Sequence, residues 1–395
     1  MRAFEDEPAA RVLAEHLADE LVKNGDIRDP IWRDVFTRVP RHVFVPHFAY
    51  IVDTPQGSRY DLVSSTNAEQ HIAWLKGVYS DTTLLTQVEG RPVEEIFAEG
   101  SGFGRHSSSS TMPGLMAWML EIADFHDGDR VLEIGTGTGY NAALLSERLG
   151  ADRVTTIDID ERLTRRARER LAVIGLHPAV VAADGRAGYE PEAPYDRVIA
   201  TCGLGYVPPA WIEQTRPGGL ILTNVTGGIG GAMLLAQVEE GNVAHGRFLD
   251  RWAGFMPSRH PTAPDVPYSD ASTSATTKLD PDLLDDAAFA FVAQMHLPQT
   301  RRYWATAADG KIVSGLRSHD GSWARVYAPD PNGSRRVEQG GSRRLWDQIE
   351  NAFGLWEGGD HPDWTRFTFE ARPGVQTVSL GGTRWTLPME DDGPI

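Results

Sequence analysis

One short segment constrains the fold of this chain more than any other: an apolar run that leads directly into three closely spaced glycines. The run Val131–Ile134 is followed by Gly135, Gly137 and Gly139, and residues suited to a helix come next. An apolar run of this kind favours a buried strand, and glycines let the backbone take dihedral angles that other residues avoid. The order therefore predicts a strand, a tight turn and a helix over residues 130–149.

The spacing of these glycines indicates the kind of ligand. A dinucleotide fingerprint has its third glycine three residues after the second. Here the third glycine comes after two residues, and an acid, Glu133, lies at the end of the strand. This arrangement disfavours a nicotinamide dehydrogenase and suits a nucleoside ligand without a pyrophosphate, for which S-adenosylmethionine is the usual example. The glycines alone also fit a strand-to-helix turn that binds nothing.

Apolar periodicity extends the pattern from residue 130 to about residue 257. Expected strands lie at 130–134, 153–158, 179–183, 196–201 and 219–225, with helices at 139–149, 160–174 and 209–215. Strands that alternate with helices form crossover units, which predict an α/β fold with a parallel sheet. Residues 234–238 and 247–255 are candidates for further strands at one edge.

Composition and charge exclude several classes of function. The formal net charge of −17 argues against a nucleic-acid partner. No apolar run is long enough to span a bilayer and the first residues do not resemble a signal peptide, so we expect no membrane partner and a cytoplasmic location. Cys202 is the only cysteine and the histidines lack zinc-ligand spacing, so no metal site is expected.

Two acidic positions follow strands of the expected sheet. Ligands of such sheets bind at the carboxyl ends of the strands, where an acid accepts hydrogen bonds from ribose hydroxyls. Asp158 has this position, and Asp160 is better placed to cap the next helix. Asp184 and Gly185 follow the third strand, where they either meet an adenine or form a simple turn.

These features and several narrower motifs make the chain resemble the protein-L-isoaspartate O-methyltransferase family over roughly residues 39–257. General class I methyltransferases share the glycine turn and the Pro-Gly-Gly of residues 217–219. The other motifs are Val39–Pro46, Thr111–Pro113, Asp184–Tyr189 and Glu192–Asp196, of which the last two are much narrower. The resemblance implies a class I, Rossmann-like methyltransferase fold that uses S-adenosylmethionine, here followed by a C-terminal α+β domain.

The resemblance also implies the residues of the site. Thr111, two residues before a proline, would place its hydroxyl against a substrate carboxylate, with Ser110 beside it as a second catalytic residue. Two plainer interpretations stay open: the serines before Thr111 form a flexible polar loop, or Thr111 caps the helix that contains Pro113. The implied cofactor-binding residues are Ser108, Ser109, Glu133, Gly135, Thr136, Gly137, Gly139, Asp158, Ile159, Asp184 and Gly185.

Together, composition and resemblance predict four parts in the chain. A stretch rich in proline, serine and threonine reads as a linker, and the aromatic residues beyond it read as short strands. The expected parts are 1–110 with N-terminal helices and a substrate-side extension, 111–257 as the methyltransferase domain, 258–278 as the linker and 279–395 as an accessory domain.

The implied reaction is methyl transfer to a carboxylate of a peptide or protein that carries aspartate or isoaspartate. Ordinary repair members of the family are little more than the catalytic domain, whereas this chain has a long segment before Ser107 and a C-terminal addition. Similar extended proteins accompany the biosynthesis of ribosomally made, modified peptides, in which methylation of an aspartate leads to an aspartimide or isoaspartate. We expect that role, with repair of isoaspartate in damaged proteins as the alternative and a non-catalytic peptide-binding protein as a third reading. The oligomeric state is not indicated.

Overall fold

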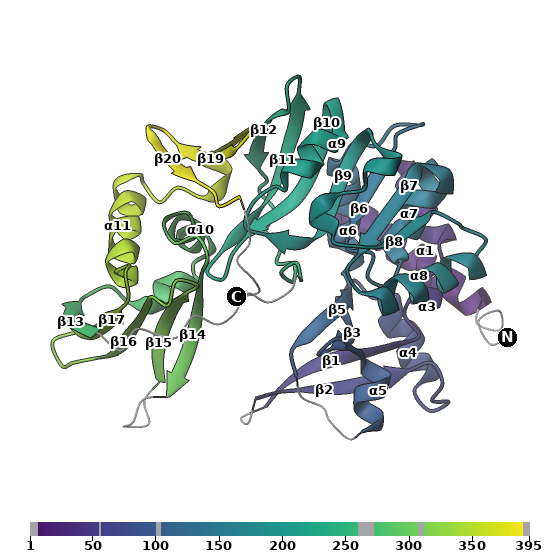
Figure 1. The fold of residues 1–395 in the computed structure, drawn as a ribbon. Helices are drawn as coiled ribbons and strands as arrows, with labels where there is room; N and C mark the ends of the chain where they lie inside the picture. The colour runs from purple at the N-terminus through teal and green to yellow at the C-terminus, as the bar shows by residue number, and fades with distance from the viewer. Residues whose placement is uncertain (1–6, 55–56, 100–103, 260–271, 307–311, 390–395) are drawn as a thin grey trace. The chain divides into compact units, whose positions relative to one another are not determined.

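The computed structural model describes residues 7–54, 57–99, 104–259, 272–306 and 312–389, and the chain divides into two compact units (Figure 1). The first unit is Met1–Ile199 and the second is Ala200–Ile395. The boundary lies inside a long strand, β9 (Tyr195–Leu204), which begins in the first unit and ends in the second. The four-part division expected from the sequence remains a proposal beside this two-unit division.

A parallel sheet with the strand order β9-β6-β7-β8 forms the centre of the first unit. Strands β6 (Val131–Ile134), β7 (Val154–Asp158) and β8 (Ala179–Ala182) pair in parallel. Helix α7 (Tyr140–Leu149) packs on β7, and α8 (Glu161–Val173) packs on β7 and β8. Each helix follows a strand and returns the chain to the next one, so the predicted α/β fold class is confirmed.

Short acidic side chains fix where several helices begin. Asp160 accepts hydrogen bonds from two backbone amides at the start of α8. Asp29 does the same for one amide of α2 (Pro30–Arg38), and Asp286 for two amides of α10 (Ala287–His296). Each carboxylate satisfies amides that have no partner within the first turn of a helix, and its negative charge suits the helix dipole there.

A second sheet of the first unit has the strand order β2-β1-β3-β4, with β5 also paired to β3. It fills the segment that the sequence left largely unassigned, and α5 packs against it. Its elements are β1 (His47–Thr54), β2 (Gly57–Ser64), β3 (Leu84–Val88), β4 (Arg91–Pro92), α5 (Val93–Ala98) and β5 (His106–Ser110). The other helices of this unit are α1 (Glu7–Asn24), α3 (Arg41–Phe44), α4 (His71–Val78) and α6 (Pro113–Ile122).

The second unit contains two antiparallel groups of strands. One has the order β20-β19-β18-β12-β11-β10 and continues to the end of β9, and the other has the order β13-β17-β16-β15-β14. Helix α10 packs on β11, and α11 packs on β15, β16 and β17. The elements are α9 (Pro209–Gln214), β10 (Thr215–Thr226), β11 (Gly231–Glu239), β12 (Val243–Phe248), β13 (Ser272–Thr277), β14 (Thr300–Thr306), β15 (Ile312–Ser318), β16 (Trp323–Pro329), β17 (Arg335–Gly340), α11 (Leu345–Gly358), β18 (Thr368–Arg372), β19 (Val375–Leu380) and β20 (Thr383–Thr386).

Two expectations for this region need correction. The strand expected at 247–255 is wrong beyond residue 248: β12 spans Val243–Phe248, and residues 249–255 are not a strand. Gly241 and Asn242, with φ angles of 78° and 58°, form a tight hairpin turn after β11 and so start β12 earlier than expected. The expected linker 258–278 contains strand β13, which pairs with β17 along its whole length. Residues 260–271 of that linker lie outside the described residues.

Candidate functional site

The glycine turn connects β6 to α7 at the carboxyl end of the parallel sheet. Gly135, Gly137 and Gly139 have φ angles of 99°, 52° and 90°, and α7 begins directly afterwards. A Cβ at Gly139 would lie 3.0 Å from the Cβ of Ala167 on α8, so the turn also needs glycine to pass close to that helix. The backbone amides of Gly135 and Thr136 donate to the carbonyl of β7 residue Ile157, at 2.8 and 3.1 Å.

A buried hydrogen-bond network holds the glycine turn against the strands beneath it in the sheet, β6 and β7. Thr136 donates to the hydroxyl of Thr156 at 2.7 Å, and Thr156 donates to Oε2 of Glu133 at 2.6 Å. Asn141 on α7 donates to Oε1 of Glu133 at 2.8 Å. Glu133 is completely buried, and burial raises its pKa to about 7 although both hydrogen bonds oppose that change. The carboxylate therefore helps to position the turn, and the cofactor contact that the sequence predicted for it stays a prediction.

The raised pKa predicts a pH-dependent stability that Glu133→Gln removes. A carboxyl group with a higher pKa in the folded state stabilises the fold below its unfolded pKa, and this stabilisation is lost as pH rises through 7. The full effect is about 3 kcal/mol, from about 1.4 kcal/mol per pKa unit. Chemical denaturation between pH 5 and 8 is expected to show that Glu133→Gln gains stability relative to the parent as pH rises. Parallel curves for the two proteins would contradict the role.

Asp158 and Asp160 have different partners at the end of β7; the predicted cap of Asp160 is confirmed, and the ribose contact of Asp158 stays a prediction. Oδ1 of Asp160 caps α8, whereas Oδ2 of Asp158 accepts from the amide of Gly137 at 3.0 Å. Asp158 is thus held at the edge of the glycine turn, at the carboxyl end of the sheet. Ile159, next in sequence, has 37% of its surface exposed although it is a large apolar residue. Both features suit a nucleoside, which needs an acceptor for ribose and an apolar surface for its base.

The third strand ends in a compact turn. Asp184 accepts from the backbone amide of Arg186 at 3.0 Å and forms an ion pair with its guanidinium. Asp184 therefore forms the simple turn that was one of its two expected roles, and the adenine contact stays a prediction. Gly185 lies against β6, because a Cβ there would come within 2.6 Å of Cγ2 of Ile134. This contact brings the end of β8 to the start of the glycine turn.

Residues Ser107–Thr111, called here the serine strap, lie against the glycine turn. Most of the strap is strand β5, so the interpretation as a flexible polar loop is wrong. A Cβ at Gly137 would point toward it, 3.7 Å from the carbonyl oxygen of Ser109 and 3.9 Å from Oγ of Ser108. The strap and turn, far apart in sequence, therefore face each other at close range, and the positive φ angle of Gly137 is what favours glycine there.

Arg41 holds the strap in place and was missed by the sequence analysis. Its guanidinium is completely buried and donates to the carbonyls of Val78 at 2.7 Å, Ser80 at 3.1 Å and Thr111 at 3.1 Å. It also donates to Oγ of Ser110 at 3.3 Å. Burial lowers the pKa of Arg41 to about 10, which leaves it charged at neutral pH. The signal available in the sequence was its place in the motif Val39–Pro46.

Thr111 itself precedes the start of α6. Met112 is the N-cap residue of that helix and no side chain caps it, so the alternative role of Thr111 as a helix cap is not found. The amide of Gly114 in the first turn donates instead to Oδ1 of Asp81 at 2.6 Å. Asp81 is a second residue at this site that the sequence analysis did not single out.

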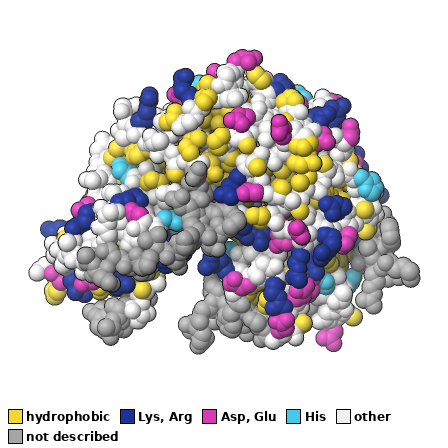
Figure 2. Space-filling view, viewed as in Figure 1, with side chains coloured by type: hydrophobic (Ala, Val, Ile, Leu, Met, Phe, Trp, Pro, Cys, Tyr) yellow, Lys and Arg dark blue, Asp and Glu magenta, His cyan; other side chains and the backbone are white. Residues whose placement is uncertain are grey.

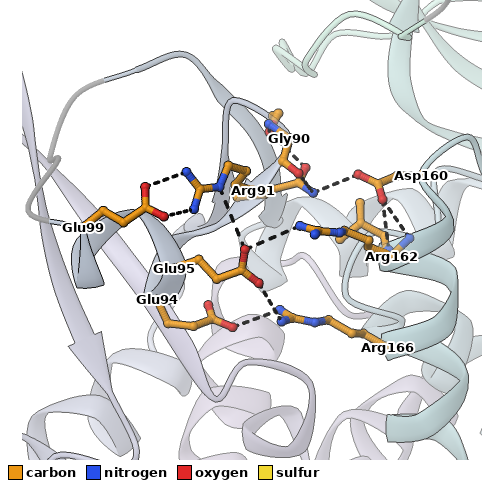
Figure 3. Close-up of polar contacts among 11 residues, drawn as sticks. Gly90, Arg91, Glu94, Glu95, Glu99, Asp160, Arg162 and Arg166 are labelled. Atoms are coloured by element: carbon orange, nitrogen blue, oxygen red, sulfur yellow. Dashed lines mark hydrogen bonds and ion pairs between the residues drawn. The ribbon is translucent and has the colours of Figure 1, made fainter.

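Ion pairs join the second sheet to α8 beside the site. Glu94 and Glu95 of α5 face Arg166 and Arg162 of α8, with closest distances of 2.9 and 3.5 Å (Figure 3). Gln87 of β3 donates to the capping carboxylate of Asp160 at 2.8 Å. Figure 2 shows acidic and basic side chains intermingled over α5 and α8. Partly exposed pairs contribute little singly, but together they tie the sheet that carries the strap to the helix that begins beside Asp158.

Comparisons with known proteins decide the family. A model described as protein-L-isoaspartate(D-aspartate) O-methyltransferase matches residues 101–245. A protein-L-isoaspartate O-methyltransferase of Ignicoccus hospitalis is 43% identical over 115 residues, which cover 29% of this chain and 54% of that protein. Protein-L-isoaspartate O-methyltransferase 2 of Archaeoglobus fulgidus is 31% identical over 233 residues, which cover 58% of this chain and 84% of that protein.

This chain belongs to the protein-L-isoaspartate O-methyltransferase family. It is accordingly a carboxyl O-methyltransferase that depends on S-adenosylmethionine, with the class I methyltransferase fold that the resemblance implied. A solved structure named protein-L-isoaspartate O-methyltransferase has the same fold, with a TM-score of 0.52 and 19% identity over 93% of this chain and 99% of its own. That coverage includes most of the C-terminal region, so the region is part of a fold already seen under the family name.

Two further observations concern alternatives to this chemistry. Among the residues that the structure describes, no group of three or more His, Cys, Asp or Glu side chains is arranged to hold a metal ion. No helix in the described part of the chain is long and apolar enough to cross a membrane. Methyl transfer to a carboxylate needs neither feature.

Proposed function

We propose that this protein methylates the side-branch carboxylate of isoaspartyl residues in polypeptides. The observation that supports this most is the serine strap lying against the glycine turn, because it sets hydroxyl groups over the carboxyl end of the parallel sheet. A substrate carboxylate at the strap and a cofactor at the turn would then be neighbours, which is the main requirement of the reaction. The preference for isoaspartate over aspartate rests on the relatives, which are named protein-L-isoaspartate O-methyltransferases, so isoaspartate repair is the preferred function.

The residues around the turn fit the cofactor. S-adenosylmethionine supplies a methyl group on positively charged sulfur, which a carboxylate oxygen displaces without any proton transfer. The space between Gly137 and the strap has no side chain from the turn, and Asp158 offers a carboxylate for the ribose. We assign cofactor contact to residues of the strap, of the glycine turn and of the segments after β7 and β8: Ser108, Ser109, Gly135, Thr136, Gly137, Gly139, Asp158, Ile159, Asp184 and Gly185. Glu133 supports the turn through its hydrogen bonds with Asn141 and Thr156.

On the substrate side, the chain needs to orient a carboxylate and not to deprotonate it. A carboxyl group with a pKa near 4 is already ionised at neutral pH, so no general base is required. We assign the carboxylate contact to the hydroxyl of Thr111. Ser110 is buried and its Oγ accepts from Arg41, so we assign it a positioning role and not the catalytic role that the resemblance implied. A neutral hydroxyl suits this role, because a strong ion pair would stabilise the ground state and slow transfer.

The role in modified-peptide biosynthesis that the sequence suggested has less support. It depended on the residues beyond the catalytic domain, and the likeness in fold to a structure named protein-L-isoaspartate O-methyltransferase spans 93% of this chain. The extra region therefore does not separate this chain from isoaspartate methyltransferases. No feature of the described residues favours aspartate in a constrained peptide over isoaspartate.

A substrate comparison tests the proposal. Radiolabelled methyl transfer is measured to three peptides of one sequence: a linear isoaspartyl peptide, a linear L-aspartyl peptide and a cyclised L-aspartyl peptide. We expect rapid methylation of the isoaspartyl peptide, with the linear aspartyl peptide at least about 100-fold slower, because misplacing the reacting atom by about 1 Å has an effect of that size. Methylation of only the cyclised peptide would overturn the proposal and restore the modified-peptide role.

Thr111→Ala tests the carboxylate contact. Loss of one hydrogen-bond donor at a reacting group is expected to lower kcat by about tenfold to 100-fold. Thr111→Ser keeps the hydroxyl and is expected to retain most of the activity. Affinity for S-adenosylhomocysteine, measured by calorimetry, is expected to stay the same in both variants. Equal activity of Thr111→Ala and the parent would remove Thr111 from the catalytic residues.

A further inference from the structure

The five-stranded sheet of the second unit has one face covered by a helix and one that carries arginines and aromatic rings. The buried side chains of Leu316, Ala324 and Val337 lie on the face against which α11 packs. Gln339 on the same face accepts from the amide of Trp346 in α11 at 3.0 Å. Side chains alternate between faces along a strand, so their neighbours in sequence belong to the opposite face.

The strand register aligns those neighbours into rows. Tyr303 pairs with Gly315, Gly315 with Arg325 and Arg325 with Glu338. In the next row on the same face, Arg301 pairs with Arg317, and Arg317 with Trp323. Tyr327 and Arg336 also contact each other on this side. We call this the basic face, and it consists of Arg301, Tyr303, Arg317, Arg325, Tyr327 and Arg336.

The basic face contrasts with the charge of the rest of the chain. The rows of the basic face hold four arginines against one acid, Glu338, although the whole chain has a formal net charge of −17. Arg301 and Arg317 are directly opposite in the register, where like charges raise the local positive potential. Arg325 and Arg336 are exposed. An acidic ligand that the rest of the protein repels would be guided to this face.

The contacts among these side chains indicate the chemistry of the ligand. The guanidinium of Arg336 lies 3.9 Å from the ring centre of Tyr327, and that of Arg325 lies 5.1 Å from the ring of Trp323. A stacked guanidinium binds a carboxylate through its in-plane N–H groups, as Arg336 binds Glu338 at 3.0 Å. Nε of Arg325 donates to the hydroxyl of Tyr303 at 3.4 Å. The ring faces, in contrast, are already occupied by arginine, so they are poor platforms for nucleic-acid bases. Glu338 lies in the same rows and pairs with Arg336 at 3.0 Å, so it offsets part of the positive charge of the basic face.

We propose that the basic face is a non-catalytic docking surface for an acidic segment of a partner polypeptide. The arginines would bind its aspartate and glutamate side chains, and the stacked rings would hold the guanidinium groups in the required orientation. This inference does not depend on the proposed methylation, because docking requires no isoaspartyl residue and no cofactor. Its failure and the failure of the proposed function are therefore separate results.

Fluorescence anisotropy with labelled probes tests the docking surface. The probes are a peptide of twelve glutamates and a twelve-nucleotide thymidine oligonucleotide, each titrated with the full chain between 50 and 300 mM salt. We expect the peptide to bind more tightly than the oligonucleotide, with affinity that falls as salt increases. R325Q/R336Q is expected to weaken peptide binding at least tenfold. R366Q/R384Q removes the same charge from exposed positions of the same unit and is expected to change binding less than twofold.

Two outcomes would overturn the proposal. Equal effects of the two double variants would mean that the peptide responds to net charge and not to the basic face. Tighter binding of the oligonucleotide, lost in R325Q/R336Q, would assign the face to single-stranded nucleic acid. If the double variant does not fold, the single substitutions Arg325→Gln and Arg336→Gln are each expected to weaken peptide binding about threefold, and the absence of any effect in both would equally reject the docking surface.

Discussion

Replacing Arg41 by methionine is expected to remove most of the methyl-transfer activity. The guanidinium is completely buried and holds the strap to the segment before β3 through the carbonyls of Val78, Ser80 and Thr111. Without it, the strap loses its fixed distance from the glycine turn, and kcat/KM is expected to fall by about 100-fold or more. The buried carbonyls also lose their donors, which lowers the free energy of unfolding by on the order of 3 kcal/mol.

Two controls separate the effect on the strap from a general loss of stability. Arg33→Met removes an arginine from the first unit that forms an exposed ion pair with Asp19, and it is expected to change activity by less than about twofold. Arg41→Lys keeps the charge but not the branched donor, so partial activity is expected. Kinetics are measured well below the Tm of each variant. Parent-like kcat/KM in folded Arg41→Met would show that the strap needs no such support.

Asp158→Ala is expected to weaken cofactor affinity while leaving the fold intact. A carboxylate that accepts from ribose hydroxyls contributes about 1.5–3 kcal/mol, which corresponds to a loss of about tenfold to 100-fold. Calorimetric titration with S-adenosylhomocysteine measures the change directly. Unchanged affinity would exclude Asp158 from the ribose site.

The neighbouring Asp160→Ala is the matched control for that measurement. Asp160 lies two residues away on the same connection, but its carboxylate caps α8 and accepts from Gln87. Its loss is expected to lower stability by about 1 kcal/mol and to change cofactor affinity by less than about threefold. Opposite results for the two variants, with Asp160→Ala losing the cofactor, would exchange the roles of the two acids.

Local sequence patterns anticipated the elements around the cofactor accurately, because those elements depend on short-range rules. The alternation of strands and helices between 130 and 226, the glycine turn and the cap of Asp160 are each encoded within a few residues. Local patterns do not predict the elements that depend on long-range pairing. The serines of the strap have no strand pattern of their own, and they form β5 because β3 offers a partner. Strand β13 similarly forms in a proline- and serine-rich stretch because β17 accepts it.

Local motifs therefore indicate the type of chemistry, but they do not determine how the side chains of the site are brought together. A nucleoside cofactor and a carboxylate substrate are indicated by the glycine spacing, the acids after two strands and the narrow family motifs. Each of these features lies within a few consecutive residues, so it can be recognised without the tertiary structure. Three features of the site join segments that lie far apart in the chain. They are the contact between strap and turn, the burial of Glu133, and the hydrogen bonds from Arg41 to carbonyls as far along the chain as Thr111. Such contacts depend on which surfaces meet when the sheet packs, and neither hydrophobic periodicity nor turn propensity carries that information.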